Sequence, residues 1–356
     1  MARGGRSRSS AARRALALAL LLGALSAASA AARDAEPPER PERPRRIQLY
    51  VMPDTQSWAG NQGGHSLATW RAVVDALCRQ RERFAMVLHT GDMVDKPRRR
   101  PEEWRAAQSV MKRLDRCGMP YAIAFGNHDF DEYPPEEGTK TLNDSRWKAL
   151  RAELAYQPEE RAPSGRTALT PLVPGWYVAT LDYRLSREDL AWLDAEIAER
   201  PGARFLALDH ACIGPAGLMR PHCGKVFERH PAIRIAVSGH WIGPVRDAWL
   251  RLPRQKGPPL IALFQNYQFV PDLAAWGVVI ELEPESGDVC VWSENLLTGE
   301  TGQPGGRHGK YVVLPGNARR CFDGSEGSKA RAAPPPEATG TVVRPEPGSM
   351  GPGRQF

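Results

Sequence analysis

Short apolar runs, each followed at once by polar or turn residues, recur along the chain. Runs that are bounded in this way predict buried strands. They lie at 47–52, 85–88, 121–125, 176–182, 204–208 and 233–237. Apolar residues at helical spacing predict helices over 65–82, 101–116 and 187–199. Because strands and helices alternate, we expect parallel strands joined by crossover helices.

Two segments depart from this alternation. Residues 130–175 begin acidic and proline-rich and contain one helical pattern, near 143–156, so we expect a cap or loop insertion beside the mouth of a site. After Arg246 the apolar runs shorten and alternate, which predicts antiparallel strands of a second sheet. These runs lie at 260–264, 277–282, 288–292 and 311–314. The expected fold class is α/β, with two packed sheets flanked by helices.

The first thirty residues have the layout of a secretory signal peptide. Five arginines and no acid precede an apolar run at 15–25, and Ala28-Ser29-Ala30 supplies a cleavage pattern. The apolar run is shorter than the ~20 residues that a membrane-spanning helix needs, and no cysteine lies near the cleavage point. We therefore expect removal of residues 1–30, no stable membrane anchor afterwards, and an exported protein, either periplasmic or secreted.

The rest of the chain is predicted to form one large domain between two polar ends. Residues 31–45 are a proline-rich charged lead-in, residues 46–322 carry the strand and helix patterns, and residues 323–356 form a Gly/Pro-rich tail that we expect to be disordered. The formal net charge of the 356-residue chain is +7, and it falls to +2 without residues 1–30. This balance gives no argument for a nucleic-acid partner. Nothing in the sequence indicates an oligomeric state.

Six cysteines in an exported protein predict disulfide bonds. Cys78 and Cys117 fall late in two predicted helices that flank neighbouring strands, and Cys212 and Cys223 bracket one loop, so these are the two pairs that we expect. The full connectivity stays open, because six cysteines allow many pairings. The chain has no C-x-x-C motif, which argues against a zinc ribbon or a thioredoxin-type redox site.

Five polar clusters follow predicted strands directly. They are Asp54-Thr55-Gln56, Gly91–Asp95, Gly126–Asp129, Asp209-His210 and Gly239-His240. The carboxyl ends of strands form the edge at which open α/β sheets build their sites. Carboxylates, an amide and imidazoles are the donors that a hydrolytic metal site needs. Each cluster alone is weak evidence, but the five together predict a metal centre.

These clusters resemble the motifs of the calcineurin-like metallophosphoesterases, which are D-x-H, G-D-x-x-D, G-N-H-D/E, a later histidine and G-H-x-H. The resemblance covers about residues 47–282, and the second and third motifs match without change. It implies a four-layer α/β/β/α sandwich and a centre with two divalent metal ions. Asp54-Thr55-Gln56, together with the late Asn266-Tyr267-Gln268, is similar to a D-T-Q variant of that family.

The resemblance also implies roles for individual residues. The implied metal ligands are Asp54, Gln56, Asp92, Asn127, His210 and His240. Asp92 would bridge the two ions, and His210 has Asp209 as the alternative ligand. His128 would contact the phosphate or protonate the leaving oxygen, with Asp129 orienting its imidazole. Asp95 would be a hydrogen-bonding partner behind the ligands.

Two departures from the motifs both affect the first metal ion. Gln56 replaces the histidine of D-x-H, and Ile242 replaces the second histidine of G-H-x-H. The remaining donors are mainly oxygens, from Asp54, Asp92 and the Gln56 carbonyl. We expect this position to bind an ion weakly or to favour Mn²⁺, Mg²⁺ or Ca²⁺ over Zn²⁺. The chain would hold one or two divalent ions, and the candidates are Mn, Fe, Zn, Mg and Ca.

Several residues outside the motifs have two interpretations. The Lys96–Arg100 run, with Arg98 and Arg99, is either a solvated loop or a surface that steers an anionic substrate. Asn266 and Gln268 are candidates for substrate binding or for supporting the ligands. His89 is either a packed core histidine or a partner of the ligands. Trp241 either lines the substrate pocket or packs in the core.

The expected function is an exported, metal-dependent phosphoesterase that hydrolyses a small phosphorylated substrate, a mono- or diester, through attack of a metal-bound hydroxide. One alternative is a non-catalytic metal- or phosphate-binding protein on the same scaffold. Another is a hydrolase of a lipid headgroup or a sugar-linked phosphate. His128 favours an enzyme, because a binding protein has no need of an imidazole there. Specificity would depend on residues 130–175 and 213–225.

Overall fold

The computed structural model describes residues 46–62, 64–133, 143–155, 158, 160–303, 305–308, 311–313 and 319–324. These residues belong to one compact unit that begins at Arg45. The signal peptide predicted over 1–30, the lead-in over 31–45 and the tail from 325 onward lie outside the described residues. Within the described part of the chain, no helix has both the length and the apolar character to cross a membrane.

The first sheet begins with the predicted alternation of strands and helices. Strands β1 (Ile47–Met52), β2 (Phe84–His89) and β3 (Tyr121–Ile123) are parallel neighbours. Helices α3 (Leu67–Arg79) and α4 (Glu102–Cys117) connect them. On the other side of β1 the sheet continues with the antiparallel strands β11 (Trp276–Leu282), β12 (Val289–Asn295) and β15 (Arg320–Phe322).

The second sheet has seven strands in the order β4-β5-β6-β7-β8-β10-β9. Its parallel centre consists of β6 (Trp176–Thr180), β7 (Arg204–Leu208), β8 (Ile233–Ser238) and β10 (Leu260–Gln265). Antiparallel strands form its edges, namely β4 (Glu160–Arg161), β5 (Ala168–Val173) and β9 (Asp247–Leu252). Helices α6 (Arg187–Ala198) and α7 (Pro221–Arg229) accompany this sheet.

Short polar signals set the helix boundaries. The hydroxyl of Ser66 accepts a hydrogen bond from the amide of Thr69 and caps α3, and Ser186 caps α6 through the amide of Asp189. Helix α4 ends at Gly118, whose φ of 68° lies in the left-handed region. The remaining helices are α2 (Gln56–Ala59), directly after the first polar cluster, and α5 (Ser145–Glu153).

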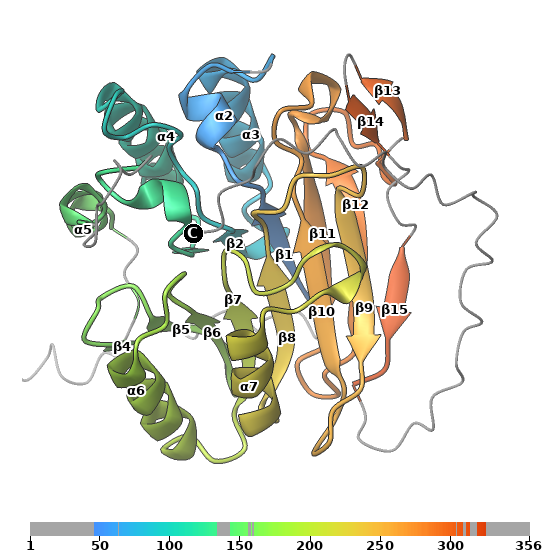
Figure 1. Ribbon diagram of the computed structural model, residues 1–356. Coiled ribbons are helices and arrows are strands. Elements are labelled where there is room, and N and C mark those ends of the chain that lie inside the picture. Colours follow the sequence, from blue (N-terminus) through green and yellow to red (C-terminus); the bar gives the residue numbers. More distant parts are fainter. Residues whose placement is uncertain are drawn as a thin grey trace, which may run out of the picture. The chain divides into compact units, whose positions relative to one another are not determined.

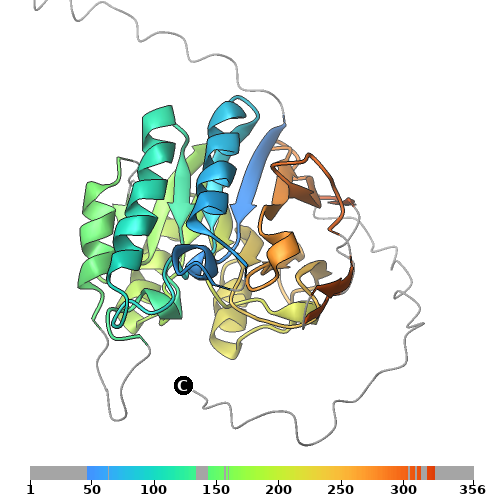
Figure 2. The same ribbon diagram turned by 90° about the horizontal axis from the view of Figure 1, so that it is seen from above.

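The two sheets pack face to face between helices (Figures 1 and 2). Alternate side chains of β1 enter different cores, because successive strand residues point to opposite faces. Tyr50 and Met52 pack with the residues of α3 and α4, whereas Leu49 and Val51 pack against the second sheet. A third core lies between the second sheet and helices α6 and α7. The expected α/β/β/α sandwich is thus confirmed.

The strands predicted after Arg246 do form antiparallel pairs, but their predicted place in one second sheet is wrong. Strand β10 lies parallel to β8 inside the second sheet, while β11 and β12 return to the first sheet. Residues 311–313 form β14, which pairs with β13 (Gly306–His308) in a separate two-stranded ribbon. Apolar alternation identified most of these strands, but it carries no information about which distant strand each one meets.

The predicted cap is also shorter than 130–175. Strands β4 and β5 belong to the second sheet, so the later part of this segment is integral to the fold. The helix expected near 143–156 is present as α5. Residues 134–142, which include most of the acidic proline-rich stretch, lie outside the described residues. Helix α7 occupies part of the predicted 213–225 loop.

Every cysteine is in a disulfide bond. Cys78–Cys117 joins the ends of α3 and α4, Cys212–Cys223 closes the loop before α7, and Cys290–Cys321 joins β12 to β15. The two expected pairs are therefore confirmed.

We predict that Cys78→Ala/Cys117→Ala destabilises the protein more than Cys212→Ala/Cys223→Ala does. The first bond closes a sequence separation of 39 residues and the second a separation of 11. The chain-entropy relation then gives a difference of about 1 kcal/mol in the free energy of unfolding. Urea titration of both double variants measures this difference, and a larger loss for the second pair would contradict it.

Candidate metal centre

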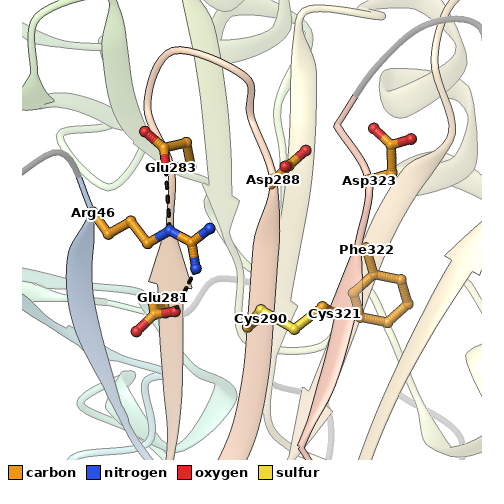
Figure 3. A pocket seen from close by; sticks show the side chains of 8 residues that line it. All are labelled: Arg46, Glu281, Glu283, Asp288, Cys290, Cys321, Phe322 and Asp323. Carbon is orange, nitrogen blue, oxygen red and sulfur yellow. Dashed lines mark hydrogen bonds and ion pairs between the residues drawn. A yellow bond between two sulfur atoms is a disulfide. The ribbon is translucent and has the colours of Figure 1, made fainter.

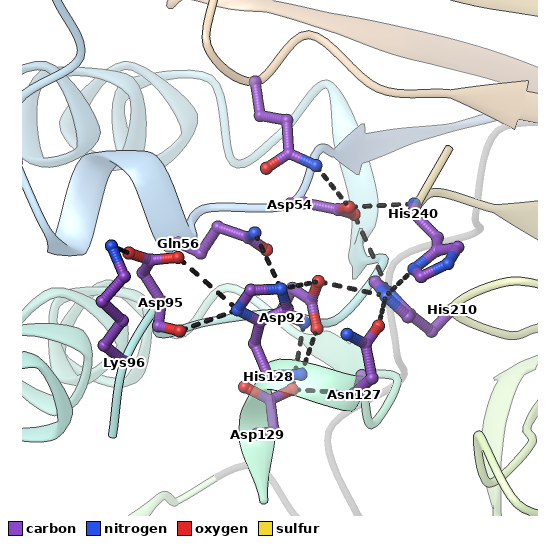
Figure 4. Close-up of polar contacts among 12 residues, drawn as sticks. Asp54, Gln56, Asp92, Asp95, Lys96, Asn127, His128, Asp129, His210 and His240 are labelled. Carbon is purple, nitrogen blue, oxygen red and sulfur yellow. Dashed lines mark hydrogen bonds and ion pairs between the residues drawn. The ribbon is translucent and has the colours of Figure 1, made fainter. Parts of the chain in front are cut away.

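Five loops bring the predicted donors to one place between the two sheets (Figure 4). The loops after β1, β2 and β3 carry Asp54, Asp92 and Asn127 from the first sheet. The loops after β7 and β8 carry His210 and His240 from the second sheet. Because the carboxyl ends of both sets of parallel strands meet here, residues more than a hundred positions apart become neighbours.

The motif glycines allow the carboxylates to approach the backbone. A Cβ atom on Gly126 would lie 2.1 Å from Oδ1 of Asp92, and one on Gly239 would lie 2.2 Å from Oδ1 of Asp54. Asp92 and His240 themselves have backbone φ values of 51° and 71°, which residues other than glycine rarely adopt. Such strain concentrates at functional sites, where the surrounding structure holds it in place.

Three donor atoms converge around the Nε2 atom of His210, which is itself a fourth. Oδ2 of Asp92 lies 3.1 Å from it, Oδ1 of Asn127 lies 3.0 Å away, and Nδ1 of His240 lies 3.0 Å away. The opposite nitrogen, Nδ1, contacts the carbonyl oxygen of Thr90 at 2.9 Å and so carries a proton. Atoms that share an ion at about 2.0–2.2 Å lie roughly 3 Å apart, so this donor set fits one divalent ion.

The charges around His210 also favour a cation. Burial alone would lower the pKa of His210, but the carboxylates of Asp92 and Asp54 outweigh it and raise this pKa to about 10. Burial and the charge of His210 lower the pKa of His240 to about 3. A proton therefore supplies positive charge between the buried carboxylates, and a metal ion would displace it on binding.

The structure distinguishes His210 from its neighbour Asp209. Oδ1 of Asp209 accepts hydrogen bonds from the amides of Ala211 and Cys212, and its carboxylate turns into its own loop. Only His210 of the two reaches the donor cluster.

The imidazole of His128 lies beside this cluster with one nitrogen facing it. Nδ1 contacts the backbone oxygen of Asp95 at 2.7 Å, and Nε2 lies 4.0 Å from Oδ2 of Asp92. The ring of Tyr133 packs on the imidazole at a centroid distance of 3.8 Å. Because the carbonyl oxygen of Asp95 can only accept, Nδ1 holds a proton and Nε2 is the atom that can exchange one with a bound molecule.

The predicted role of Asp129 needs correction. Its carboxylate accepts hydrogen bonds from three backbone amides, those of Gly126, Asp92 and Met93, at 2.8–3.0 Å. It therefore joins the loops after β2 and β3, and Asp95 orients His128. The sequence suggested Asp129 because it is adjacent to His128, but the imidazole and this carboxylate point in different directions.

The residues predicted around the first metal ion do not converge on a common point as the donors around His210 do. Oε1 of Gln56 is buried without a hydrogen-bond partner among the described residues, and Nε2 of Gln56 lies 3.4 Å from Nε2 of His128. Ile242 is 53% exposed and offers no donor atom. The side chains of Asn266 and Gln268 both contact Asp54.

The basic loop after Asp92 contacts the site through Asp95, the residue that orients His128. Lys96 pairs with the carboxylate of Asp95 at 2.9 Å, whereas Arg99 is exposed and Arg98 is half-buried. Steering of an anionic substrate by Arg98 and Arg99 stays a prediction.

Residues outside the motifs also support the site, and one of them, His89, was a candidate from the sequence. His89 accepts a hydrogen bond from the amide of Gly91 and donates to the hydroxyl of Thr55, so it supports two of the loops. The ring of Tyr183 lies 5.8 Å from that of His210, and Arg220 donates to its hydroxyl at 3.2 Å. Tyr183 and Arg220 follow no metal-binding motif, and only their proximity in the fold identifies them.

A separate cavity of about 310 Å³ lies at the edge of the first sheet (Figure 3). Arg46 pairs there with Glu281 and Glu283, beside the Cys290–Cys321 disulfide. Its lining includes no histidine, and two of its carboxylates, those of Glu281 and Glu283, pair with Arg46, so it does not resemble the cluster around His210.

One family model matches more than half of this chain. The family model for calcineurin-like phosphoesterases matches residues 47–244. A stretch of 167 residues is 24% identical to the uncharacterized protein YvnB of Bacillus subtilis (strain 168), covering 45% of this chain and 13% of that protein. The chain thus spans only a small part of that relative.

Two solved structures are also similar to this chain. One is the purple acid phosphatase PPD1 from yellow lupin seeds, with 16% identity, a TM-score of 0.49, and coverage of 72% of this chain and 52% of that one. The other is a dimetal phosphatase from Danio rerio, with 15% identity, a TM-score of 0.47, and coverage of 72% and 98%.

We predict that Gly126→Ala weakens metal binding by roughly 10–100-fold, since the added methyl group displaces Asp92. The φ of −99° at Gly126 is open to alanine, so the effect is steric. Gly118→Ala is the matched control, because its Cβ would meet no atom within 4 Å. It costs only about 1 kcal/mol of backbone strain. Isothermal titration with Mn²⁺ measures both variants, and equal affinities would contradict the prediction.

Proposed function

The chain belongs to the calcineurin-like phosphoesterase family, and on that premise we propose that it hydrolyses phosphate esters with the metal centre around His210. The observation that carries the proposal is the convergence of Asp92, Asn127 and His240 on Nε2 of His210, beside the imidazole of His128, whose Nε2 lies 4.0 Å from Oδ2 of Asp92. Ligands and a proton-transfer group together are what metal-assisted ester hydrolysis requires.

Each residue has a defined task in this proposal. A divalent ion supplies, when bound, positive charge for the phosphoryl oxygens and makes a water molecule more acidic. Thr90 fixes the ring of His210 so that Nε2 points at the ion. Asp95 fixes the ring of His128 so that Nε2 faces the substrate. There the imidazolium form would deliver its Nε2 proton to the leaving oxygen, or donate a hydrogen bond to a phosphoryl oxygen.

The rival function is a binding protein without catalysis. The arrangement of His128 favours the enzyme, because its Nδ1 is held on a carbonyl and its Nε2 is directed into the cluster. A protein that only binds metal or phosphate has no need for a proton-transfer group in this orientation.

We also propose that the protein is exported and belongs to a D-T-Q variant of the family. The signal-peptide pattern in residues 1–30 and the three disulfides support export. Asp54-Thr55-Gln56 and Asn266-Tyr267-Gln268, which meet in the fold, support the variant.

We predict metal-dependent hydrolysis of aryl phosphate mono- or diesters, measured with Mn²⁺, Zn²⁺, Mg²⁺ or chelator. His128→Ala should lower kcat by roughly 10²–10⁴-fold while the ion stays bound. Asp92→Asn should abolish both ion retention and turnover. A folded protein that binds an ion but hydrolyses neither ester with any metal would support the binding protein instead.

The rim of the centre suits an apolar or aromatic alcohol group on the ester. Leu218, Trp241 and Ile242 are 73%, 39% and 53% exposed, and Trp241 and Ile242 directly follow His240. Gly214 lies between Leu218 and Trp241. Its amide donates to the Leu218 carbonyl, and a Cβ atom added to it would lie 3.1 Å from the indole nitrogen of Trp241. Exposed apolar side chains gathered beside a polar site indicate a binding surface.

We predict that Trp241→Ala lowers kcat/KM for an aryl phosphate by roughly 2–10-fold more than for glycerol phosphate, because only the aryl group can stack on the indole. Leu297→Ala is the control, since Leu297 is 46% exposed but belongs to the turn after β12. Equal losses for the two esters in Trp241→Ala would exclude a role for Trp241 in specificity.

A further inference from the structure

We propose that the centre holds one metal ion, and that hydrogen-bond donors, including the side-chain amides of Asn266 and Gln268, take the place of the first ion beside Asp54. The inference rests on the metal centre of the proposed function, but it does not depend on which ester is cleaved.

Asp54 is surrounded by protein donors. Its Oδ2 accepts hydrogen bonds from the amide of His240 at 2.9 Å, Nδ2 of Asn266 at 3.1 Å and Nε2 of Gln268 at 3.4 Å. Its Oδ1 accepts one from the hydroxyl of Thr90 at 2.7 Å. Four donors satisfy a buried carboxylate in the way that a cation would otherwise do.

The amide of Asn266 cannot turn to offer its oxygen to an ion. Its Oδ1 already accepts the backbone N–H of Gln268 at 3.0 Å, so Nδ2 must face Asp54. The backbone amide of Asn266 donates to the carbonyl of Arg246 at 2.7 Å. The buried guanidinium of Arg246 contacts the carbonyl oxygens of Asn266 and Gln268 at 3.5 and 3.3 Å. Arg246 thus holds the loop that carries Asn266 and Gln268 in place.

Asp54 also lies on the wrong side of His210 to share its ion. The nearest nitrogen of His210 to Oδ1 of Asp54 is Nδ1, at 3.9 Å, and Nδ1 carries the proton held by Thr90. The ion would lie at Nε2, on the opposite edge of the ring. Asp54 therefore anchors the His240 loop through the backbone, and it does not ligate the ion at Nε2.

The other ligand positions of the first metal ion also lack donors. Ile242 offers no donor, and Gln56 provides only the amide oxygen Oε1. Without Asp54 the remaining donors are Asp92 and Gln56, fewer than the three protein ligands of an open catalytic metal site. The substitutions at Gln56 and Ile242 and the contacts of Asn266 and Gln268 thus have one common explanation.

The test counts ions in the purified full chain. The protein is loaded with Mn²⁺ and freed of excess ion by gel filtration. Its metal content is measured by plasma mass spectrometry, and electron paramagnetic resonance reports whether ions are coupled. We expect one ion per chain, with the spectrum of an isolated Mn²⁺. Two ions per chain with a coupled spectrum would overturn the proposal, and so would the absence of any retained ion.

The matched variants are Asp54→Asn and Asp92→Asn, which remove the same charge from neighbouring loops. We expect Asp54→Asn to keep one ion and Asp92→Asn to lose it, with circular dichroism confirming that each is folded. A folded Asp54→Asn that loses the ion would contradict the proposal, because the asparagine oxygen can still accept the hydrogen bond from the amide of His240 that Asp54 accepts. The wild-type count stands even if Asp54→Asn does not fold. Since no substrate is present, an inactive protein with one ion would contradict the proposed function and leave this inference intact.

Discussion

The hydrogen bond from Nδ1 of His210 to the carbonyl oxygen of Thr90 joins a loop of the second sheet to a loop of the first at the metal centre. His210 follows a strand of the second sheet, and Thr90 follows a strand of the first. This bond fixes which nitrogen of the ring is free, and around that nitrogen the donors of three other loops gather. The packing of the two sheets therefore determines whether these donors can bind one ion, since a shift of either sheet would separate them.

Much of the fold was predictable from sequence because strands buried on both faces produce long apolar runs. The parallel strands and connecting helices of residues 47–125 appear as predicted. The partners of the later strands were not predictable, because β11 returns to β1 across more than two hundred residues. Local apolar alternation is the same whichever sheet a strand joins, and only the complete set of packed faces decides the partner.

The candidate site was predictable as a set of residues, but the partners of those residues were not. Asp92, Asn127, His210 and His240 meet as the motifs imply. Asp129 was assigned to His128 from its adjacency, yet its carboxylate binds three backbone amides instead. Motifs identify residues that a site needs, whereas hydrogen-bond direction depends on how separate loops approach. For the same reason, only the fold showed that Asn266 and Gln268 act on Asp54.

The central claim is that one ion sits at Nε2 of His210, and anomalous diffraction from crystals grown with Mn²⁺ tests it most directly. Data on both sides of the manganese absorption edge locate every bound ion without reference to activity. The account predicts one anomalous peak, within bonding distance of Asp92, Asn127, His210 and His240, with Asp54 still bound to Asn266. A second peak roughly 3.5–4 Å away and bonded to Asp54, as in two-metal sites, would contradict it.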